Sequence, residues 1–200
     1  MKKVIDINLG GQKFTIDEDA YKELDTYLKT INKHFSTSSG FEDIIYDIEV
    51  RIAELLEESG SQIVTLTKVK EIQKIMGTPE DFGAEPTSEM DSTKVNKRFF
   101  RDPDDKVLGG VISGFAAYIG FKNIAILRVI VFLMFLSGVG IIPYIILWYI
   151  IPEAVTASDK LAMKGEDINV NSIAKAVEDG VTEIKETVED LSKNLKQKFS

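Results

Sequence analysis

The sequence contains no cysteine and only one histidine, His34. The lack of cysteine excludes disulfides and thiolate metal ligands. The sequence also lacks the HExxH and GxSxG motifs of hydrolases and the Asp-x-Asp-x-Asp-Gly loop of calcium sites. His34 lies at the end of a predicted helix, where a cationic side chain is structurally ordinary. We therefore expect a protein that is not an enzyme, with no catalytic residues, no metal site and no cofactor.

A long apolar run is missing from the N-terminus, where Asp6 and Asn8 interrupt the only hydrophobic stretch. We therefore predict no signal peptide and an N-terminal domain that remains in the cytoplasm. Charge is segregated along the chain, with a net charge of −9 over residues 1–92 and +4 over residues 93–128. Because the acidic N-terminal part would repel phosphates, we expect no nucleic-acid partner.

Residues 1–83 have the pattern of a compact α+β domain with the element order ββααβα. Alternating apolar residues flank the pair Gly10-Gly11 and predict a β-hairpin over residues 5–16. The elements expected after it are two amphipathic helices, a short β-branched strand and a helix capped by Thr67, over residues 17–35, 41–56, 63–66 and 67–76. Residues 84–97 have no apolar periodicity and are predicted to be a linker.

The stretch Val107–Ile151 carries only two charges, at Lys122 and Arg128. Its uncharged part, residues 129–151, is longer than the roughly 18 apolar residues that mark a candidate membrane span. A buried helix of a soluble core rarely needs to be apolar on every face. We therefore predict that residues 98–152 form an all-α membrane module.

A break divides this apolar run at Ser137–Gly140, with Pro143 just after it. Two geometries are therefore open. One is a single kinked and tilted helix that crosses the bilayer and places the C-terminus outside, and this is the geometry that we favour. The other is a re-entrant hairpin of two short helices packed on residues 107–119, with the C-terminus in the cytoplasm.

Basic and aromatic residues stand where this module is expected to meet the bilayer surface, because cations bind anionic headgroups and aromatic rings favour the interface. The predicted membrane-interface set is Lys97, Arg98, Phe99, Phe100, Arg101, Arg128, Tyr144 and Trp148. Small residues and a helix-bending proline are expected to allow close helix packing, with Gly110-x-x-x-Gly114 as a small-xxx-small pattern. The predicted packing set is Gly110, Gly114, Gly120, Gly138, Gly140 and Pro143.

A polar connector is expected over residues 153–167 and an amphipathic helix over residues 168–199. Apolar residues of that helix recur at spacings of three and four, as in the seam of a coiled coil or of a helix docked on the same chain. The predicted heptad seam is Val177, Val181, Ile184, Val188, Leu191 and Leu195. The expected fold class is thus an α+β N-terminal domain (ββααβα) followed by an all-α membrane module and a C-terminal amphipathic helix.

A set of motif residues is concentrated in residues 98–152 and includes an arginine, several small residues and a terminal Tyr/Trp/Pro series. These residues are Arg101, Asp105, Lys106, Leu108, Gly110, Val111, Gly114, Ala116, Tyr118, Gly120, Arg128, Gly138, Gly140, Tyr144, Trp148 and Pro152. On these residues the segment resembles the phage shock protein C (PspC) domain family. It departs from the family where Phe121-Lys122-Asn123 replaces the more usual Ile-Asp-Pro. Residues 1–83 resemble the N-terminal domain of Bacteroidetes-type members.

The resemblance implies a bacterial envelope-stress sensor or adaptor in the inner (cytoplasmic) membrane that acts by protein–protein and protein–lipid contacts. Its implied partners are the lipid bilayer and other membrane-stress proteins of the phage shock protein A or B type. The alternative function is a membrane-anchored structural interaction protein that oligomerises through its C-terminal helix. In that case a second copy of the chain is the partner of the heptad seam.

Overall fold

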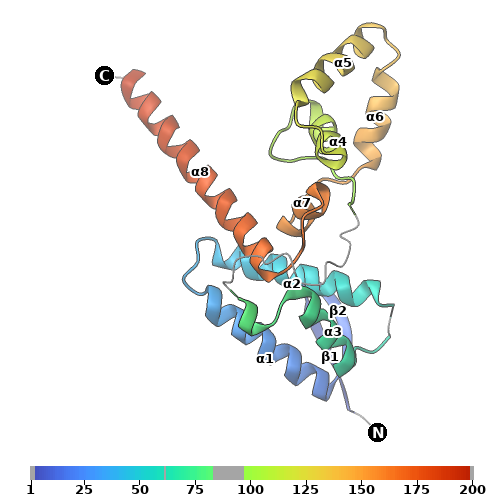
Figure 1. Cartoon of the computed structure of the whole chain (residues 1–200), viewed down its shortest axis with the longest axis vertical. Helices are drawn as coiled ribbons and strands as arrows, with labels where there is room; N and C mark the ends of the chain where they lie inside the picture. The colour runs from blue at the N-terminus through green and yellow to red at the C-terminus, as the bar shows by residue number, and fades with distance from the viewer. Residues whose placement is uncertain (1–2, 61, 83–96, 199–200) are drawn as a thin grey trace. The chain divides into compact units, whose positions relative to one another are not determined.

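The computed structural model describes residues 3–60, 62–82 and 97–198, and within them the side chains of all but residues 80 and 194–198. The chain divides into two compact units (Figure 1). One unit consists of Met1–Ser88 and Asn169–Ser200, and the other of Glu89–Ile168. The predicted linker at residues 84–97 lies outside the described residues, apart from its last residue.

The N-terminal unit begins with a two-stranded antiparallel sheet formed by β1 (Val4–Leu9) and β2 (Gln12–Asp17). The register pairs Ile5 with Ile16 and keeps the alternating apolar residues on one face. Both glycines between the strands have positive φ, as a two-residue primed turn requires. The predicted hairpin is confirmed.

Three helices and a short 3-10 turn complete this part of the unit: α1 (Glu18–Phe35), α2 (Phe41–Glu58), α3 (Leu66–Met76) and η1 (Pro79–Asp81). Their apolar residues recur every three or four positions and are buried together, which forms the core of the unit. These core residues are Leu24, Ile31, Ile44, Ile48, Ile52, Leu56, Val69, Ile72 and Met76, and Ile16 of β2 is buried with them. The hydroxyl of Tyr27 donates a buried hydrogen bond of 2.7 Å to the carbonyl of Gly77, and burial raises the pKa of Tyr27.

The predicted third strand at residues 63–66 does not form. Val64 makes only an isolated parallel bridge to Ile16, with its N–H donating to the Thr15 carbonyl at 2.9 Å. Helix α3 already begins at Leu66, and its N-cap is Thr65 rather than Thr67. The β-branched run is therefore too short for a strand because the following helix takes its last residue. The order in this part of the chain is ββααα instead of ββααβα.

The C-terminal helix α8 (Val170–Lys198) belongs to the same unit as the N-terminal residues. Its first turns pack on α2, and Ile173 is fully buried. Asn171 Nδ2 donates a 2.8 Å hydrogen bond to the carbonyl of Asp81, which attaches the start of α8 to η1. The amphipathic helix predicted over residues 168–199 is present, and its first part contacts the same chain.

The second unit contains η2 (Leu108–Gly110), α4 (Val111–Ile119), α5 (Ile124–Leu136), α6 (Ile141–Ile150) and α7 (Ala157–Lys164). Its core lies between α4, α7 and the extended segment before η2. Helix α7 lies within residues 153–167, where only a polar connector was expected. Thr156 and Asp159 form a capping box at its start, and Leu161 is buried on its inner face.

The favoured prediction of one continuous membrane-crossing helix is wrong. The apolar run is divided into α5 and α6, with Gly138 at φ 76° in the turn between them. Over residues 3–60, 62–82 and 97–198, we find no helix that combines the length and the apolar character needed to cross a bilayer. The predicted fold class is therefore corrected: the described residues form a two-stranded sheet and eight α-helices, without the third strand and without a spanning helix.

Candidate functional site

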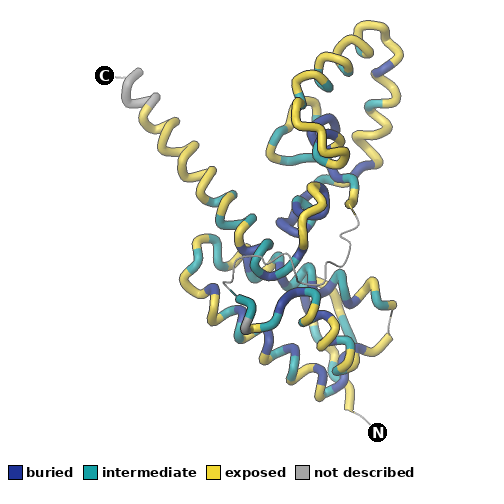
Figure 2. The backbone as a smooth tube through the Cα atoms, in the orientation of Figure 1, coloured by how far each residue is buried: buried dark blue, intermediate teal, exposed yellow. Residues whose placement is uncertain are grey.

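The pair of helices α5 and α6 and the turn between them, residues 124–150, form what we call the apolar hairpin. No residue of α5 or α6 is buried, although both helices consist almost entirely of apolar residues. Leu136 is 70% exposed and Tyr149 is 90% exposed. Figure 2 shows the exposed colour over most of both helices. Soluble proteins rarely expose a continuous apolar surface of this kind, so the hairpin is a strong candidate for an interaction site.

Arg128 is the only charged residue of the apolar hairpin. Its Nη2 forms an ion pair with Oδ1 of Asp105 at 2.5 Å. Its Nε is buried and has no hydrogen-bond partner among the described residues. The guanidinium therefore turns toward the loop before η2, and the Asp105 carboxylate compensates the charge that Arg128 brings to an apolar helix.

Arg101 joins the two ends of the segment that contains the apolar hairpin. Its Nε donates a 2.9 Å hydrogen bond to the carbonyl of Ile151, at the end of α6. Its Nη1 donates a 3.2 Å hydrogen bond to the carbonyl of Gly109, in η2. Its Nη2 lies 3.5 Å from Oε2 of Glu153, and the Arg101 side chain is only 19% exposed. A planar guanidinium with several donors suits this arrangement, because it can bind groups in different directions at once.

Backbone hydrogen bonds hold the same two segments side by side. The N–H of Arg101 donates to the Pro152 carbonyl at 2.8 Å, and the N–H of Ala154 donates to the Arg101 carbonyl at 3.0 Å. These bonds form a short parallel bridge between Arg101 and Glu153. The side-chain contacts of Arg101 therefore rest on a fixed backbone pairing.

Two aromatic residues of α6 also contact η2. The hydroxyl of Tyr144 donates a 2.5 Å hydrogen bond to the carbonyl of Leu108. The indole of Trp148 lies so close to Gly109 that an added Cβ would be 2.5 Å from Nε1. We call Arg101, Gly109, Tyr144, Trp148 and Glu153 the clasp, because together they attach the end of the apolar hairpin to η2.

Glu153 receives a second cation in the clasp. Lys106 Nζ lies 2.5 Å from its Oε1. The hydrogen bond from Lys106 lowers the pKa of the Glu153 carboxyl, with further attraction from Lys106 and Arg101. Glu153 and Lys106 were not among the predicted site residues. An acidic residue directly after an apolar run, with basic residues before that run, was the signal that could have suggested the pair.

The predicted interface residues before η2 do not all face outward. Phe100 and Arg101 are directed into the unit, and Phe100 is buried. Lys97 and Arg98 are exposed, and Arg98 lies 5.6 Å from the centre of the Phe100 ring. Phe99 contacts the rings of two residues of α4, Phe115 and Tyr118. Of the basic residues in this stretch, Lys97 and Arg98 therefore remain accessible to an anionic surface.

The predicted packing glycines lie in two places. Gly110 and Gly114 leave room for the backbone of Phe100 and Asp102, which an added Cβ would overlap. At these two glycines the backbone is therefore approached by an extended segment of the same chain, and not by another helix. The remaining members of the set lie at helix ends: Gly120 ends α4, Gly138 and Gly140 lie in the turn of the apolar hairpin, and Pro143 lies in the first turn of α6.

The predicted heptad seam is divided between residues that pack on the same chain and residues that are exposed. An added Cβ at Gly40 would lie 3.0 Å from Val177 and 3.1 Å from Val181, so these two residues pack on the start of α2. Ile184 and Val188 lie further along α8 and are 65% and 59% exposed. Leu191 is similarly exposed, and the side chain of Leu195 lies outside the described side chains.

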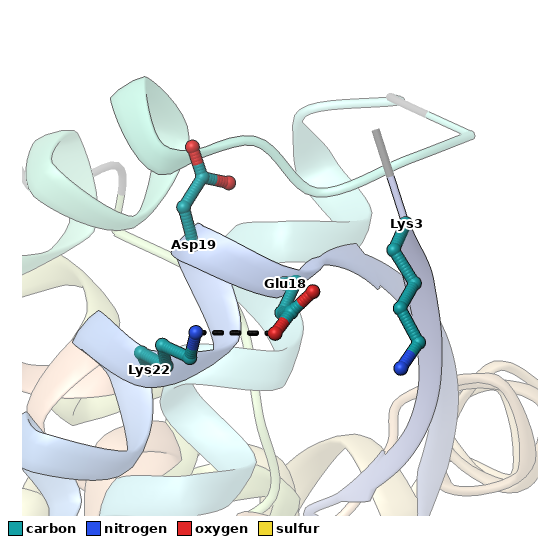
Figure 3. A pocket seen from close by; sticks show the side chains of 4 residues that line it. All are labelled: Lys3, Glu18, Asp19 and Lys22. Atoms are coloured by element: carbon teal, nitrogen blue, oxygen red, sulfur yellow. Dashed lines mark hydrogen bonds and ion pairs between the residues drawn. The ribbon is translucent and has the colours of Figure 1, made fainter. Parts of the chain in front are cut away.

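A shallow hollow elsewhere in the N-terminal unit is lined by Lys3, Glu18, Asp19 and Lys22 (Figure 3). Lys22 Nζ lies 3.1 Å from Glu18 Oε1, and this hydrogen bond lowers the pKa of Glu18. The pair joins residues one helical turn apart on an exposed face, which is common on helix surfaces. Among the described residues, no group of three or more His, Cys, Asp or Glu side chains could hold a metal ion.

Residues 97–154 match the PspC domain family. The matched segment contains the clasp and the apolar hairpin, and the PspC family is not known for enzymatic activity. The chain matches no curated protein and no solved structure. The resemblance of residues 1–83 to the Bacteroidetes-type N-terminal domain therefore stays a prediction.

Proposed function

Because residues 97–154 form a PspC domain, we propose that this chain is a sensor and adaptor of a phage-shock-type stress response at the bacterial inner membrane. PspC domains are generally membrane-associated and indicate a role in this type of response. The observation that carries the proposal is the apolar hairpin, whose helices bury none of their residues. We propose that the apolar hairpin lies in lipid and enters the bilayer from the cytoplasmic side.

The physical reason is the cost of leaving the apolar hairpin in water. Exposed apolar surface costs about 25 cal/mol per Å² relative to an apolar environment. In a bilayer each Ile, Leu, Val or Phe instead contributes about −0.3 to −0.6 kcal/mol to insertion. With 13 and 10 residues, α5 and α6 have lengths of about 20 and 15 Å, so the hairpin would enter about half of a hydrocarbon core of about 30 Å.

The turn of the apolar hairpin is suited to this surrounding. A backbone in lipid must satisfy its hydrogen bonds internally, because no water is present to replace them. The N–H of Ser137 donates to Leu133, that of Gly138 to Phe135 and that of Gly140 to Met134, at 3.3, 2.9 and 3.2 Å. The Ser137 hydroxyl donates to the Met134 carbonyl at 2.7 Å. A turn with these internal bonds can be placed among acyl chains at low cost.

The N-terminal unit contains chain segments from both sides of the PspC domain, and this supports a hairpin that leaves the bilayer on the side where it enters. Asn169–Ser200 follows the PspC domain in the sequence and belongs to one compact unit with Met1–Ser88, which precedes it. Asn171 of α8 donates a hydrogen bond to Asp81 of that unit, and Val177 and Val181 lie against its Gly40. A chain that enters and leaves the bilayer on one side allows this contact. We propose that the unit is cytoplasmic and presents its surface to other stress proteins, with those of the phage shock protein A or B type as candidates.

The test uses the full chain with single cysteines, since the native sequence has none. Spin labels at Val139→Cys, Ile126→Cys and Ile150→Cys report the turn and the two ends of the apolar hairpin in phosphatidylethanolamine–phosphatidylglycerol vesicles. We expect the label at residue 139 to be the deepest, with the highest oxygen accessibility and the lowest nickel-chelate accessibility. The exposed Tyr46→Cys of α2 is the matched control and should show the aqueous pattern.

Two outcomes would contradict the proposal in different ways. Equal nickel-chelate accessibility at residues 139 and 46 would show that the apolar hairpin does not lie in lipid. Labels at residues 126 and 150 that lie on opposite sides of the bilayer, with residue 139 between them, would show that the segment crosses the bilayer and does not return to its side of entry.

A further inference from the structure

We propose that the distal part of α8, residues 184–195, pairs with the same part of a second copy of this chain as a short parallel two-stranded coiled coil. This surface is separate from the apolar hairpin, and the proposal does not require lipid. It assigns a specific partner to a part of the helix that the fold of one chain leaves uncovered.

The first observation is the division of the heptad seam within one continuous helix. Val177 and Val181 pack against Gly40, and the last described polar contact of α8 with the unit is from Lys185 Nζ to Ser39 Oγ at 3.1 Å. After Val181 the spacing of the seam continues unchanged, but Ile184 and Val188 are exposed. Figure 2 shows the exposed colour along these turns. The same seam thus contacts its own chain in its first half and is available in its second.

The length of the uncovered part argues that it has a partner. Residues 184–195 correspond to about three turns, or about 18 Å of helix. Isolated helices little longer than about 12–15 residues are marginal in water, and their stability in proteins comes from packing of an apolar face. An uncovered helix with an apolar stripe is therefore stabilised by any surface that covers the stripe.

The charge pattern indicates which surface this is. With Val181 and Val188 at heptad position a, the positions that flank the seam on the described distal turns carry Lys185, Thr187 and Ser192. No like charges therefore face each other across a pair of these helices. The acidic residues lie on the outer positions, and they are Glu183, Glu186, Glu189 and Asp190.

The same pattern argues against two other occupants. Helices that lie on anionic lipid carry Lys or Arg beside their apolar face, and nucleic acid requires a basic surface. Over residues 184–195 there are three acidic residues and two basic ones, Lys185 and Lys193, and of these two only Lys185 flanks the seam. The pattern favours a second copy of the helix as the partner, because the positions beside its seam also carry little charge.

The identity of the seam residues favours a parallel pair. At the centre of the free seam, position a carries Val188, which is β-branched, and position d carries Leu191; the other seam residues are Ile184 at d and Leu195 at a. β-Branched residues at a, with leucine at d, favour two parallel strands. In that arrangement Val188 of one chain lies opposite Val188 of the other. Because the free seam covers only about two heptads, we expect a weak pair whose population rises with protein concentration.

The test is disulfide formation in the full chain, which contains no native cysteine. Val188→Cys places a thiol in the seam, and Glu186→Cys, also exposed, places one on the outer face as a matched control. Under mild oxidation we expect at least a tenfold higher yield of covalent dimer for Val188→Cys, and that yield should increase with protein concentration. Adding Leu191→Asp to Val188→Cys should lower the yield of covalent dimer to that of Glu186→Cys. Circular dichroism reports whether α8 remains helical in this double variant.

Three results would overturn the proposal. The first is equal dimer yield for the two single variants, including no dimer for either. The second is a dimer that forms only when Val188→Cys and Leu191→Cys chains are mixed, which indicates antiparallel pairing. The third is a spin label at residue 188 that becomes shielded when lipid vesicles are added to monomeric protein, which identifies lipid as the occupant. None of these results changes the depth expected at residue 139, so this inference and the proposed function can fail separately.

Discussion

The indole of Trp148 covers Gly109, so that a Cβ at residue 109 would lie 2.5 Å from the indole Nε1. Gly109 also has φ of 82°, a conformation that other residues adopt only with strain. This contact places the end of α6 against η2, beside the carbonyl that Arg101 binds. The sole tryptophan of the chain is therefore a direct reporter of the clasp.

We predict that Gly109→Ala destabilises the PspC domain more than Gly120→Ala does. Both glycines have positive φ, so each substitution has a backbone cost of about 1–2 kcal/mol. Only Gly109→Ala also forces Trp148 to move, because no atom lies within 4 Å of an added Cβ at Gly120. The overlap should add about 1–3 kcal/mol. Thermal unfolding followed by Trp148 emission measures the difference, and equal midpoints would show that the Trp148 contact contributes nothing.

Arg101→Lys tests whether the clasp needs the shape of a guanidinium or only a positive charge. A lysine ammonium cannot donate to the Ile151 and Gly109 carbonyls while it also faces Glu153. Each hydrogen bond that involves a charged group contributes about 1.5–3 kcal/mol, so we expect a loss of at least about 2 kcal/mol. Arg98→Lys is the matched control, because Arg98 is exposed, and its change should stay within about 0.5 kcal/mol. The two variants are compared by the same Trp148 unfolding signal, and similar small changes would mean that charge alone suffices.

Acidification should loosen the clasp through Glu153. The hydrogen bond from Lys106 lowers the pKa of this carboxyl in the folded state below the ordinary value of 4.5. A lowered folded pKa contributes stability that is fully present above the unfolded pKa and is lost as the pH falls through the folded pKa. We therefore expect Trp148 emission to shift toward that of exposed indole below about pH 4.5 in the wild type. Glu153→Gln should show the looser state already at neutral pH and a flatter response to acid, and an unchanged acid response would assign the transition to other groups.

Local periodicity predicted the elements whose apolar residues all face one core. The helices α1 and α2 follow from a 3–4 spacing, and the structure fully buries Ile31, Ile48 and Ile52 of that series. The run at residues 63–66 was misassigned because β-branched residues suit a strand and a helix start alike, and tertiary contacts decided between them. Helix α7 was missed because few of its residues are large and apolar, so its periodicity is weak.

The clasp could not be read from side-chain patterns because most of its contacts involve backbone atoms. Arg101 binds the carbonyls of Ile151 and Gly109, and Tyr144 binds that of Leu108. A carbonyl is present at every residue, so its use leaves no trace in composition or spacing. The length of the uncharged run likewise could not show whether one helix or two would form, since the hydrogen bonds of the turn at residues 137–140 decide this.

The docking of α8 on its own chain depends on the small size of residue 40. We predict that Gly40→Ala weakens this docking, because the added Cβ would lie 3.0 Å from Val177 and 3.1 Å from Val181. Gly60→Ala is the matched control in the same unit, since Gly60 also has positive φ but has no atom within 4 Å of an added Cβ. Amide hydrogen exchange over residues 170–181 should become faster in Gly40→Ala by about tenfold, which corresponds to about 1.4 kcal/mol, and should stay unchanged in Gly60→Ala. Release of Val177 and Val181 would also lengthen the free seam, so the dimer yield at Val188→Cys should rise in the Gly40→Ala background. Faster exchange without that rise would show that the docked half of the seam does not compete with pairing.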